Sequence, residues 1–146
     1  LFRLSRLMGI DCGNPILPPV REEGYLSGSW YDPSHSGEGY NVEVLIDGQV
    51  VVYWFSYDPE GKRRWFFGLG EVREGKLVFD EILTSSGGIF GPQFNPDQVE
   101  YKPWGTLELD LDCHGGTATY SSTEDGFGSG TLNLERLTNI DQLACP

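Results

Sequence analysis

Short runs in which apolar and polar residues alternate, separated by tight-turn sequences, recur along most of this chain. The clearest run is residues 106–113 (TLELDLDC), which has three leucines and a cysteine on one side and a threonine and three acidic residues on the other. A period of two residues is typical of a β-strand with one buried face and one face in water. The pattern therefore predicts an all-β fold.

Eight runs of this kind occur, at residues 27–31, 40–46, 50–57, 64–72, 76–83, 106–113, 117–122 and 130–137. Turn sequences such as Asp47-Gly48 separate neighbouring runs, and Asp-Gly is a strong hairpin signal. Eight hairpin-linked strands can close on themselves, which removes the exposed edges of the sheet. We therefore expect an eight-stranded antiparallel up-and-down barrel of the calycin or avidin-like type, and a β-sandwich is the alternative. The irregular segment 84–98 is long enough to bind or cover something.

The N-terminal part of the chain has a different character. Residues 1–10 are apolar and basic, and residues 11–24 contain three prolines and two glycines, as expected of an extended linker. Ten residues do not hold a helix in water without a surface to pack on, so this segment must dock on a barrel or stay disordered. We predict an arm and Pro-rich linker at 1–24 and one barrel domain at 25–146. The apolar contacts of the arm would come from Leu1, Phe2, Leu4, Leu7 and Met8.

Charge is distributed unevenly along the chain. The net charge is −12, and because residues 1–21 hold three arginines and one aspartate, the remainder carries −14. An acidic body repels phosphate backbones, so nucleic acid is not an expected partner. The chain lacks an apolar run of about 18 residues, which predicts no membrane span. Its His and Cys spacing matches no zinc site and its acidic residues match no EF-hand, so we predict no metal and no cofactor.

Three cysteines, Cys12, Cys113 and Cys145, leave one without an internal partner. In a meander the end of run 106–113 and the segment after run 130–137 can approach, which favours a Cys113–Cys145 disulfide. Cys12 would then be available to a second chain. A Cys12–Cys145 pairing stays open, because sequence alone does not decide connectivity.

The last predicted strand places Arg136 on the inward side, in line with Leu132 and Leu134. An inward arginine needs a partner, and Trp30 on the first strand becomes its neighbour once the barrel closes. Stacking of Arg136 on Trp30 would seal the barrel floor by a cation–π contact. This arrangement resembles that of lipocalin and avidin-like barrels, whose first strand opens with Gly-x-Trp and whose last strand returns an arginine.

The polar loop 32–38 is the candidate site for catalysis or ligand binding. His35 is a potential general base, with Asp32 or Glu38 to orient it and Ser36 as nucleophile, which would make the protein a hydrolase. The same four residues are a potential ligand loop at the barrel mouth. Neighbours on a loop are not placed in line by their spacing, so we expect a structural turn and no catalytic residues.

Aromatic residues are concentrated in runs 50–57 and 64–72, which are apolar on both sides. One side fits the core, and the other fits a pocket, a sugar-stacking platform or a buried assembly surface. The residues concerned are Trp54, Tyr57, Trp65, Phe66 and Phe67 in these runs, together with Trp104 further along the chain.

Longer motifs cover residues 28–145. They are GSWYDPSHSGEGY at 28–40, VYWFSYDPEG at 52–61, RWF at 64–66, GGIF at 87–90, WGTL at 104–107, DC at 112–113, GSGTL at 128–132 and RLT at 136–138, closing on Cys145. With these motifs the chain resembles an uncharacterised family of secreted bacterial β-domains. The resemblance implies an exported domain, used alone or joined to other extracellular modules, and it assigns no catalytic residue.

Together these features predict a non-enzymatic extracellular module, secreted or at the cell surface. We expect it to assemble with copies of itself, in filaments if each arm docks on the next body. The alternatives are a barrel that binds a small ligand or glycan, and a hydrolase that uses His35.

Overall fold

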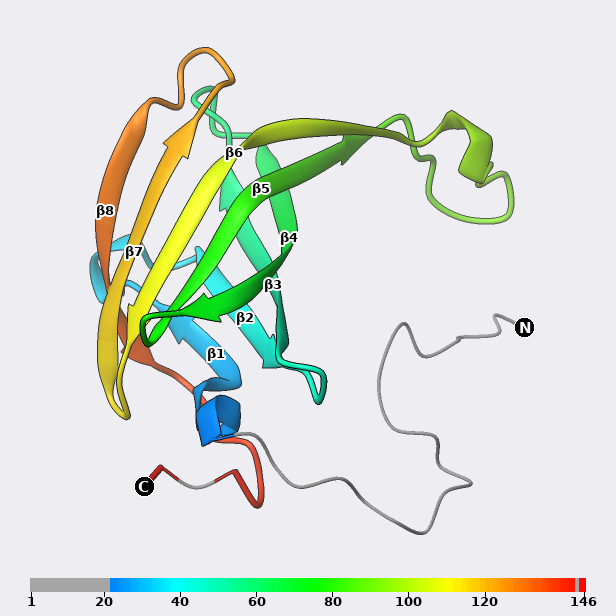
Figure 1. The fold of residues 1–146 in the computed structure, drawn as a ribbon. Helices are drawn as coiled ribbons and strands as arrows, with labels where there is room; N and C mark the ends of the chain where they lie inside the picture. The colour runs from blue at the N-terminus through cyan, green and yellow to red at the C-terminus, as the bar shows by residue number, and fades with distance from the viewer. Residues whose placement is uncertain (1–21, 144) are drawn as a thin grey trace, which may run out of the picture.

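The alternating runs form eight antiparallel strands that close into one barrel (Figure 1). The computed structural model describes residues 22–143 and 145–146. Each strand pairs with the next along the chain, and the first pairs with the last, which confirms the predicted up-and-down barrel and makes the sandwich wrong. The strands are β1 (Gly28–Tyr31), β2 (Gly39–Val44), β3 (Gln49–Tyr57), β4 (Arg63–Arg73), β5 (Lys76–Ser86), β6 (Glu100–Leu111), β7 (Gly115–Ser122) and β8 (Ser129–Arg136).

Inward-facing side chains fill the barrel. On β6 the three leucines of the alternating run are buried, as the pattern predicts. Part of the interior is an aromatic cluster around Trp54, with ring centroids of four other aromatic residues 5.1 to 5.5 Å away. These rings fill the core to the exclusion of water. The alternate side chains of each strand point to the outer surface. The largest buried side chains are Trp30, Tyr40, Trp54, Phe66, Phe79 and Trp104.

Two glycines on β4 make room for one of these aromatic rings. A Cβ atom on Gly70 would lie 2.3 Å from the carbonyl oxygen of Val78 and 2.6 Å from Cδ1 of Phe79, and one on Gly68 would lie 3.4 Å from Cδ1 of Phe79. The pairing of β4 with β5 shifts register beside these glycines. Close approach of two backbones therefore lets Phe79 enter the core with no exposed surface.

Strands β5 and β6 are longer than their neighbours and project from one end of the barrel (Figure 1). Pairing with β4 reaches Thr84 and pairing with β7 begins at Gly105, while β5 and β6 continue to pair with each other as far as Ser86 and Glu100. Sequence alone places the start of β6 at residue 106, because Pro103 and its polar neighbours hide the strand pattern. The connection that follows β5 contains η3 (Pro96–Gln98) and carries Phe90, whose side chain is fully exposed.

The first described element is η1 (Glu22–Leu26), a 3-10 helix against the base of the barrel. Residues 22–24 are thus helical and not part of an extended linker, because Leu26 is buried and its carbonyl accepts a hydrogen bond of 3.1 Å from Trp30 Nε1. The predicted arm and Cys12 lie outside the described residues. So do the five predicted arm contacts, Leu1, Phe2, Leu4, Leu7 and Met8.

Substitution of Gly70 by alanine tests the close approach of β4 and β5. We expect Gly70→Ala to lower the free energy of unfolding by about 1 to 3 kcal/mol, because the nearest atom is a backbone oxygen that moves only if the strand pair separates. Urea unfolding at 25 °C measures the change. Leu69→Ala, at the next position but facing outward, is the matched control with a smaller expected loss. A smaller loss for Gly70→Ala than for the control would contradict this packing.

Candidate binding surface on the outer face of the barrel

Arg136 closes the base of the barrel. The pairing of β1 with β8 sets it opposite Trp30, and its guanidinium carbon lies 4.1 Å from the Trp30 ring centroid. Its Nε donates a hydrogen bond of 2.8 Å to the carbonyl oxygen of Cys113, and burial lowers the pKa of the guanidinium from its ordinary value. The cation–π contact between Arg136 and Trp30 fills this end of the barrel, so we call it the floor and not a ligand entrance.

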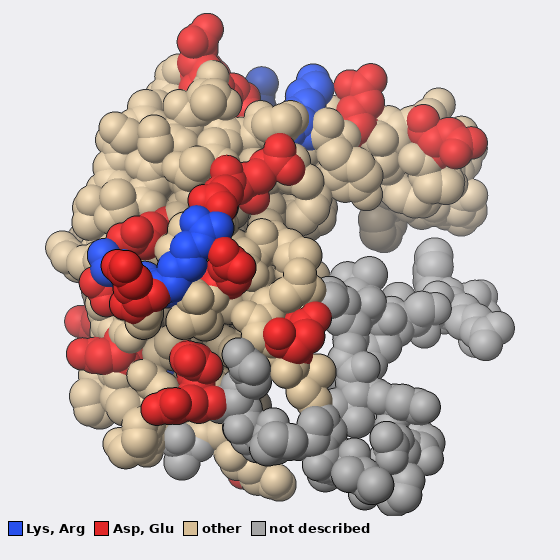
Figure 2. Space-filling view, viewed as in Figure 1, with Lys and Arg blue, Asp and Glu red and all other residues tan. Residues whose placement is uncertain are grey.

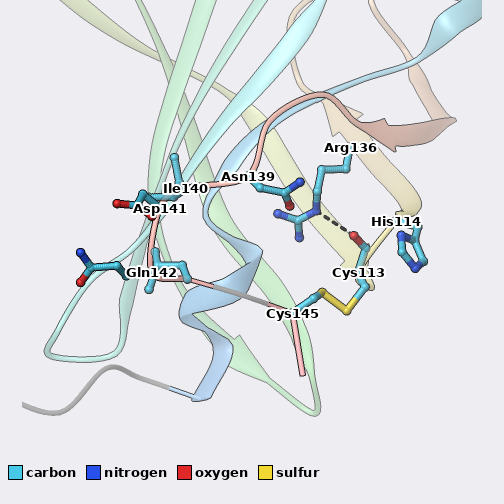
Figure 3. A pocket seen from close by; sticks show the side chains of 9 residues that line it. Cys113, His114, Arg136, Asn139, Ile140, Asp141, Gln142 and Cys145 are labelled. Carbon is cyan, nitrogen blue, oxygen red and sulfur yellow. Dashed lines mark hydrogen bonds between the residues drawn. A yellow bond between two sulfur atoms is a disulfide. The ribbon is translucent and has the colours of Figure 1, made fainter.

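A disulfide joins Cys113 to Cys145, with Cα atoms 5.6 Å apart, and confirms the favoured pairing. It holds the C-terminal tail beneath the floor, where an open hollow of about 730 Å³ lies outside the barrel (Figure 3). Figure 3 shows the Arg136 side chain among the residues that line the hollow, with the hydrogen bond from its Nε to the Cys113 carbonyl dashed. The hollow is lined by Cys113, His114, Arg136, Asn139, Ile140, Asp141, Gln142, Leu143 and Cys145.

The loop after β1 forms a capped turn, η2 (Pro33–His35). Asp32 caps it, accepting hydrogen bonds from the Ser34 backbone (2.8 Å) and the Ser34 hydroxyl (2.6 Å). These two bonds hold the pKa of Asp32 below its ordinary value. His35 Nδ1 lies 3.2 Å from Asp32 Oδ2 and 3.0 Å from Ser34 Oγ. The turn therefore uses its polar side chains to satisfy its own backbone.

The other two predicted loop residues, Ser36 and Glu38, have different contacts. Glu38 accepts a hydrogen bond of 2.8 Å from the Ser56 hydroxyl on β3, and Ser36 forms a short bridge with Glu38. The hydroxyl next to the His35 ring is that of Ser34, which is already donated to Asp32. The structure thus brings Asp32 and His35 together, and among the described residues neither forms a hydrogen bond with the Ser36 hydroxyl that the hydrolase interpretation requires.

The end of the barrel opposite the floor is closed by the β7–β8 connection. Arg64 on β4 forms a bidentate ion pair with Glu124, with distances of 3.1 and 2.9 Å. The guanidinium also lies over the rings of Phe66 and Phe127, at 5.6 and 5.5 Å. Phe127 packs edge-on against Trp104 in the core. Both ends of the barrel are therefore covered by side chains.

Four buried polar atoms lack a hydrogen-bond partner among the described residues. They are Tyr40 Oη, Trp54 Nε1, Trp104 Nε1 and Arg136 Nη2. Burial raises the pKa of the Tyr40 hydroxyl, which keeps that group neutral. Three of the four are polar atoms of aromatic rings that pack against one another in the filled core of the barrel.

The outer surface of β3 to β6 carries a continuous apolar patch, which we call the outer aromatic face. The strand register sets Phe55 beside Trp65, and it sets Tyr53, Phe67, Leu83 and Pro103 in one row across four strands. Trp65 stacks on Phe67 at 5.1 Å, and Phe67 meets Tyr101 edge-on at 5.8 Å. The face comprises Tyr53, Phe55, Trp65, Phe67, Leu69, Leu83, Tyr101 and Pro103.

Several members of this face are strongly exposed. Phe55 is 53% exposed, Trp65 41%, Leu69 50% and Tyr101 64%. A contiguous exposed apolar surface is typical of a site where another molecule binds. Sequence reasoning selected Trp65 and Phe67 but missed Leu69 on β4. It also missed Leu83 and Tyr101, whose outward direction depends on the bulge in β5 and on the early start of β6.

The outer surface of β6 to β8 is polar by contrast. Thr119 and Thr131 form a cross-strand hydrogen bond of 3.2 Å, and Glu108 on β6 pairs with Lys76 at 2.7 Å. Asp and Glu predominate over Lys and Arg on the side of the molecule in Figure 2. The outer surface of the barrel is thus polar on β6 to β8 and apolar on β3 to β6.

In residues 22–143 and 145–146, His, Cys, Asp and Glu do not gather in groups of three or more that could hold a metal ion. A helix with the length and apolar composition needed to cross a bilayer does not occur in the same residues.

Loss of the disulfide should weaken the fold. The two cysteines are 32 residues apart, so we expect Cys113→Ser/Cys145→Ser to lower the free energy of unfolding by about 3 to 4 kcal/mol. Urea unfolding without reductant measures it. Cys12→Ser is the matched control and should leave the midpoint unchanged. Equal midpoints for all three proteins would show that the bond does not stabilise the barrel.

Acid should weaken the η2 turn through Asp32. A carboxyl whose pKa is lowered by folding contributes stability above its unfolded pKa and loses it as pH falls through the folded value. Asp32→Asn should therefore show a shallower loss of stability than the native chain below about pH 4, measured by urea unfolding at stepped pH. Ser36→Ala, in the same loop but outside the Asp32 hydrogen bonds, should keep the native slope. Identical slopes for Asp32→Asn and the native chain would contradict this role.

Comparison of the chain with known family models, curated proteins and solved structures finds no match. The resemblance to a secreted bacterial family thus stays a prediction, and what is established is the barrel itself.

Proposed function

We propose that this protein is a non-enzymatic extracellular module that assembles with copies of itself through its N-terminal arm. The observation that carries the proposal is the outer aromatic face, an exposed apolar surface that covers four strands of a barrel with a filled core. Water contact with such a surface is unfavourable by roughly 25 cal/mol for each Å². A partner that covers the face therefore gains binding energy without rearranging the barrel.

The closed interior supports an external binding role. Trp30 and Arg136 seal one end, and Arg64, Glu124 and Phe127 cover the other. A small ligand would have to displace packed aromatic rings to enter, whereas the outer face is open to solvent. The hydrogen bonds of His35, which involve Asp32 and Ser34, favour a structural turn over a hydrolase.

Charge supports the arm as the complementary element. Residues 1–21 are apolar and carry three arginines against one aspartate, while the rest of the chain carries −14. Opposite charge steers two copies together and sets the orientation of docking. If each arm docks on the next body, the contact is head-to-tail and continues into an open filament.

A secreted or cell-surface location fits the same proposal. A structural disulfide such as Cys113–Cys145 persists in oxidising compartments, and it is rare in the cytosol. The resemblance to secreted bacterial domains points in the same direction. Cys12 would then be available for a covalent link between copies.

Removal of the arm should abolish assembly. The deletion must stop before Glu22, because η1 packs against the barrel. We expect the full chain to form large assemblies in light scattering and negative-stain images, and the chain 22–146 to be a monomer with the same β-sheet circular dichroism. The full chain with Cys12→Ser separates covalent from non-covalent assembly on non-reducing gels. A monodisperse, non-covalent full-length monomer would contradict the proposed function.

A further inference from the structure

We propose that the arm of one copy binds the outer aromatic face of a neighbouring copy, with its arginines next to Glu81 at the edge of that face. This inference rests on the proposed function and names the acceptor surface, which the arm hypothesis leaves open. The occupant is residues 1–21 of a second copy of this chain. The acceptor is the set of outward side chains on β3 to β6.

The reach of the arm is sufficient for this contact. The described chain begins at η1, at the base of the barrel, and 21 residues precede it. An extended segment of that length spans roughly 70 Å, whereas the longest strand, β6 with 12 residues, spans roughly 40 Å. The arm can therefore leave its own barrel and cover the face of the next one from end to end.

Closure of the barrel decides how the arm can bind. Every strand from β1 to β8 pairs on both sides, so the wall offers no edge to which another strand could be added, except where β5 and β6 project. A strand-addition contact is confined to that projection. Over the rest of the surface an incoming segment binds through its side chains, and the aromatic face is where apolar side chains find apolar partners.

The two surfaces also match in charge. Arg73 is already paired with Glu71 and Asp80, and Lys76 with Glu108. Glu81 is exposed and forms no ion pair with any described residue. Glu81 lies two residues before Leu83 on β5, and a Cβ atom on Gly68, beside Leu69, would lie 3.0 Å from its backbone carbonyl oxygen, so the residue is at the edge of the aromatic face. Arg3 and Arg6 supply the cations that this border lacks.

Complementation between two disabled full-length variants tests the inference. The face variant, Trp65→Ser/Tyr101→Ser, keeps its arm and loses two exposed members of the acceptor. The arm variant, Phe2→Ser/Leu4→Ser/Leu7→Ser, keeps its acceptor. We expect each alone to be a monomer in light scattering and their mixture to form a complex of twice the chain mass. Such a complex cannot extend, because only one contact in it is intact.

Matched controls separate this docking from a general loss of solubility or charge. Leu137→Ser changes an apolar residue that is 62% exposed but lies outside the aromatic face, and it should assemble like the native chain. Glu81→Gln should weaken assembly several-fold more than Glu135→Gln on the outer side of β8. Circular dichroism and urea midpoints check that every variant keeps the barrel.

The outcomes distinguish the two levels of the proposal. A full-length native chain that is monomeric ends the proposed function and this inference with it. If the native chain assembles and the face variant assembles equally well, this inference alone is overturned. The arm then binds a different surface, and the outer aromatic face is left for another ligand such as a glycan. Two monomeric variants whose mixture gives no complex also overturn it.

Discussion

Closure of the barrel by its first and last strands is the constraint on which the rest of the structure depends. β1 and β8 meet over two residue pairs, Trp30 with Arg136 and Tyr31 with Glu135. Such a short seam needs support from side chains, and the stacking of Arg136 on Trp30 supplies it together with the bond from the Trp30 indole to Leu26. The Cys113–Cys145 disulfide lies beside the same seam and ties down the tail that follows it.

The closed wall accounts for the character of the outer surface. Because the barrel wall has no strand edges to pair and the core is filled by aromatic rings, the surface that the barrel offers to other molecules consists mainly of outward-pointing side chains. On β6 to β8 these are threonines and acidic residues, which water solvates well. On β3 to β6 they are aromatic and aliphatic, and the cross-strand rows bring them into one surface. The same alternation thus builds both the core and the contact surface.

Much of the fold is predictable from sequence because alternation is a local signal. Leu107, Leu109 and Leu111 identify β6 and its inward side without any knowledge of neighbouring strands. The helical start at Glu22 and the extension of β6 to Glu100 are not predictable in this way, since both depend on contacts with distant residues. Pro103 hides the strand start locally, although pairing with Leu83 maintains it.

The candidate binding surface is harder to predict from sequence, because it too depends on contacts between distant residues. Trp54 and Trp65 look alike in the chain, and only the register shows that one is buried and the other is exposed. The polar loop 32–38 is a candidate catalytic site by sequence because it contains histidine, serine and carboxylate side chains. Its hydrogen bonds instead close a turn around Asp32. Proximity in sequence identifies the polar residues of this loop, but it does not show which hydrogen bonds their side chains form.

Both described ends of the chain lie at the base of the barrel, with η1 and the disulfide-bound tail close to the seam (Figure 1). A force applied to the chain at Glu22 is transmitted to β1 through η1, whose Leu26 is buried and accepts a hydrogen bond from the Trp30 indole. The hydrogen bonds of β1 to β2 and β8 run across the strand, so a force along β1 loads them together in shear. If copies join through the arm as proposed, tension along β1 is therefore carried by several bonds of the shortest strand at once.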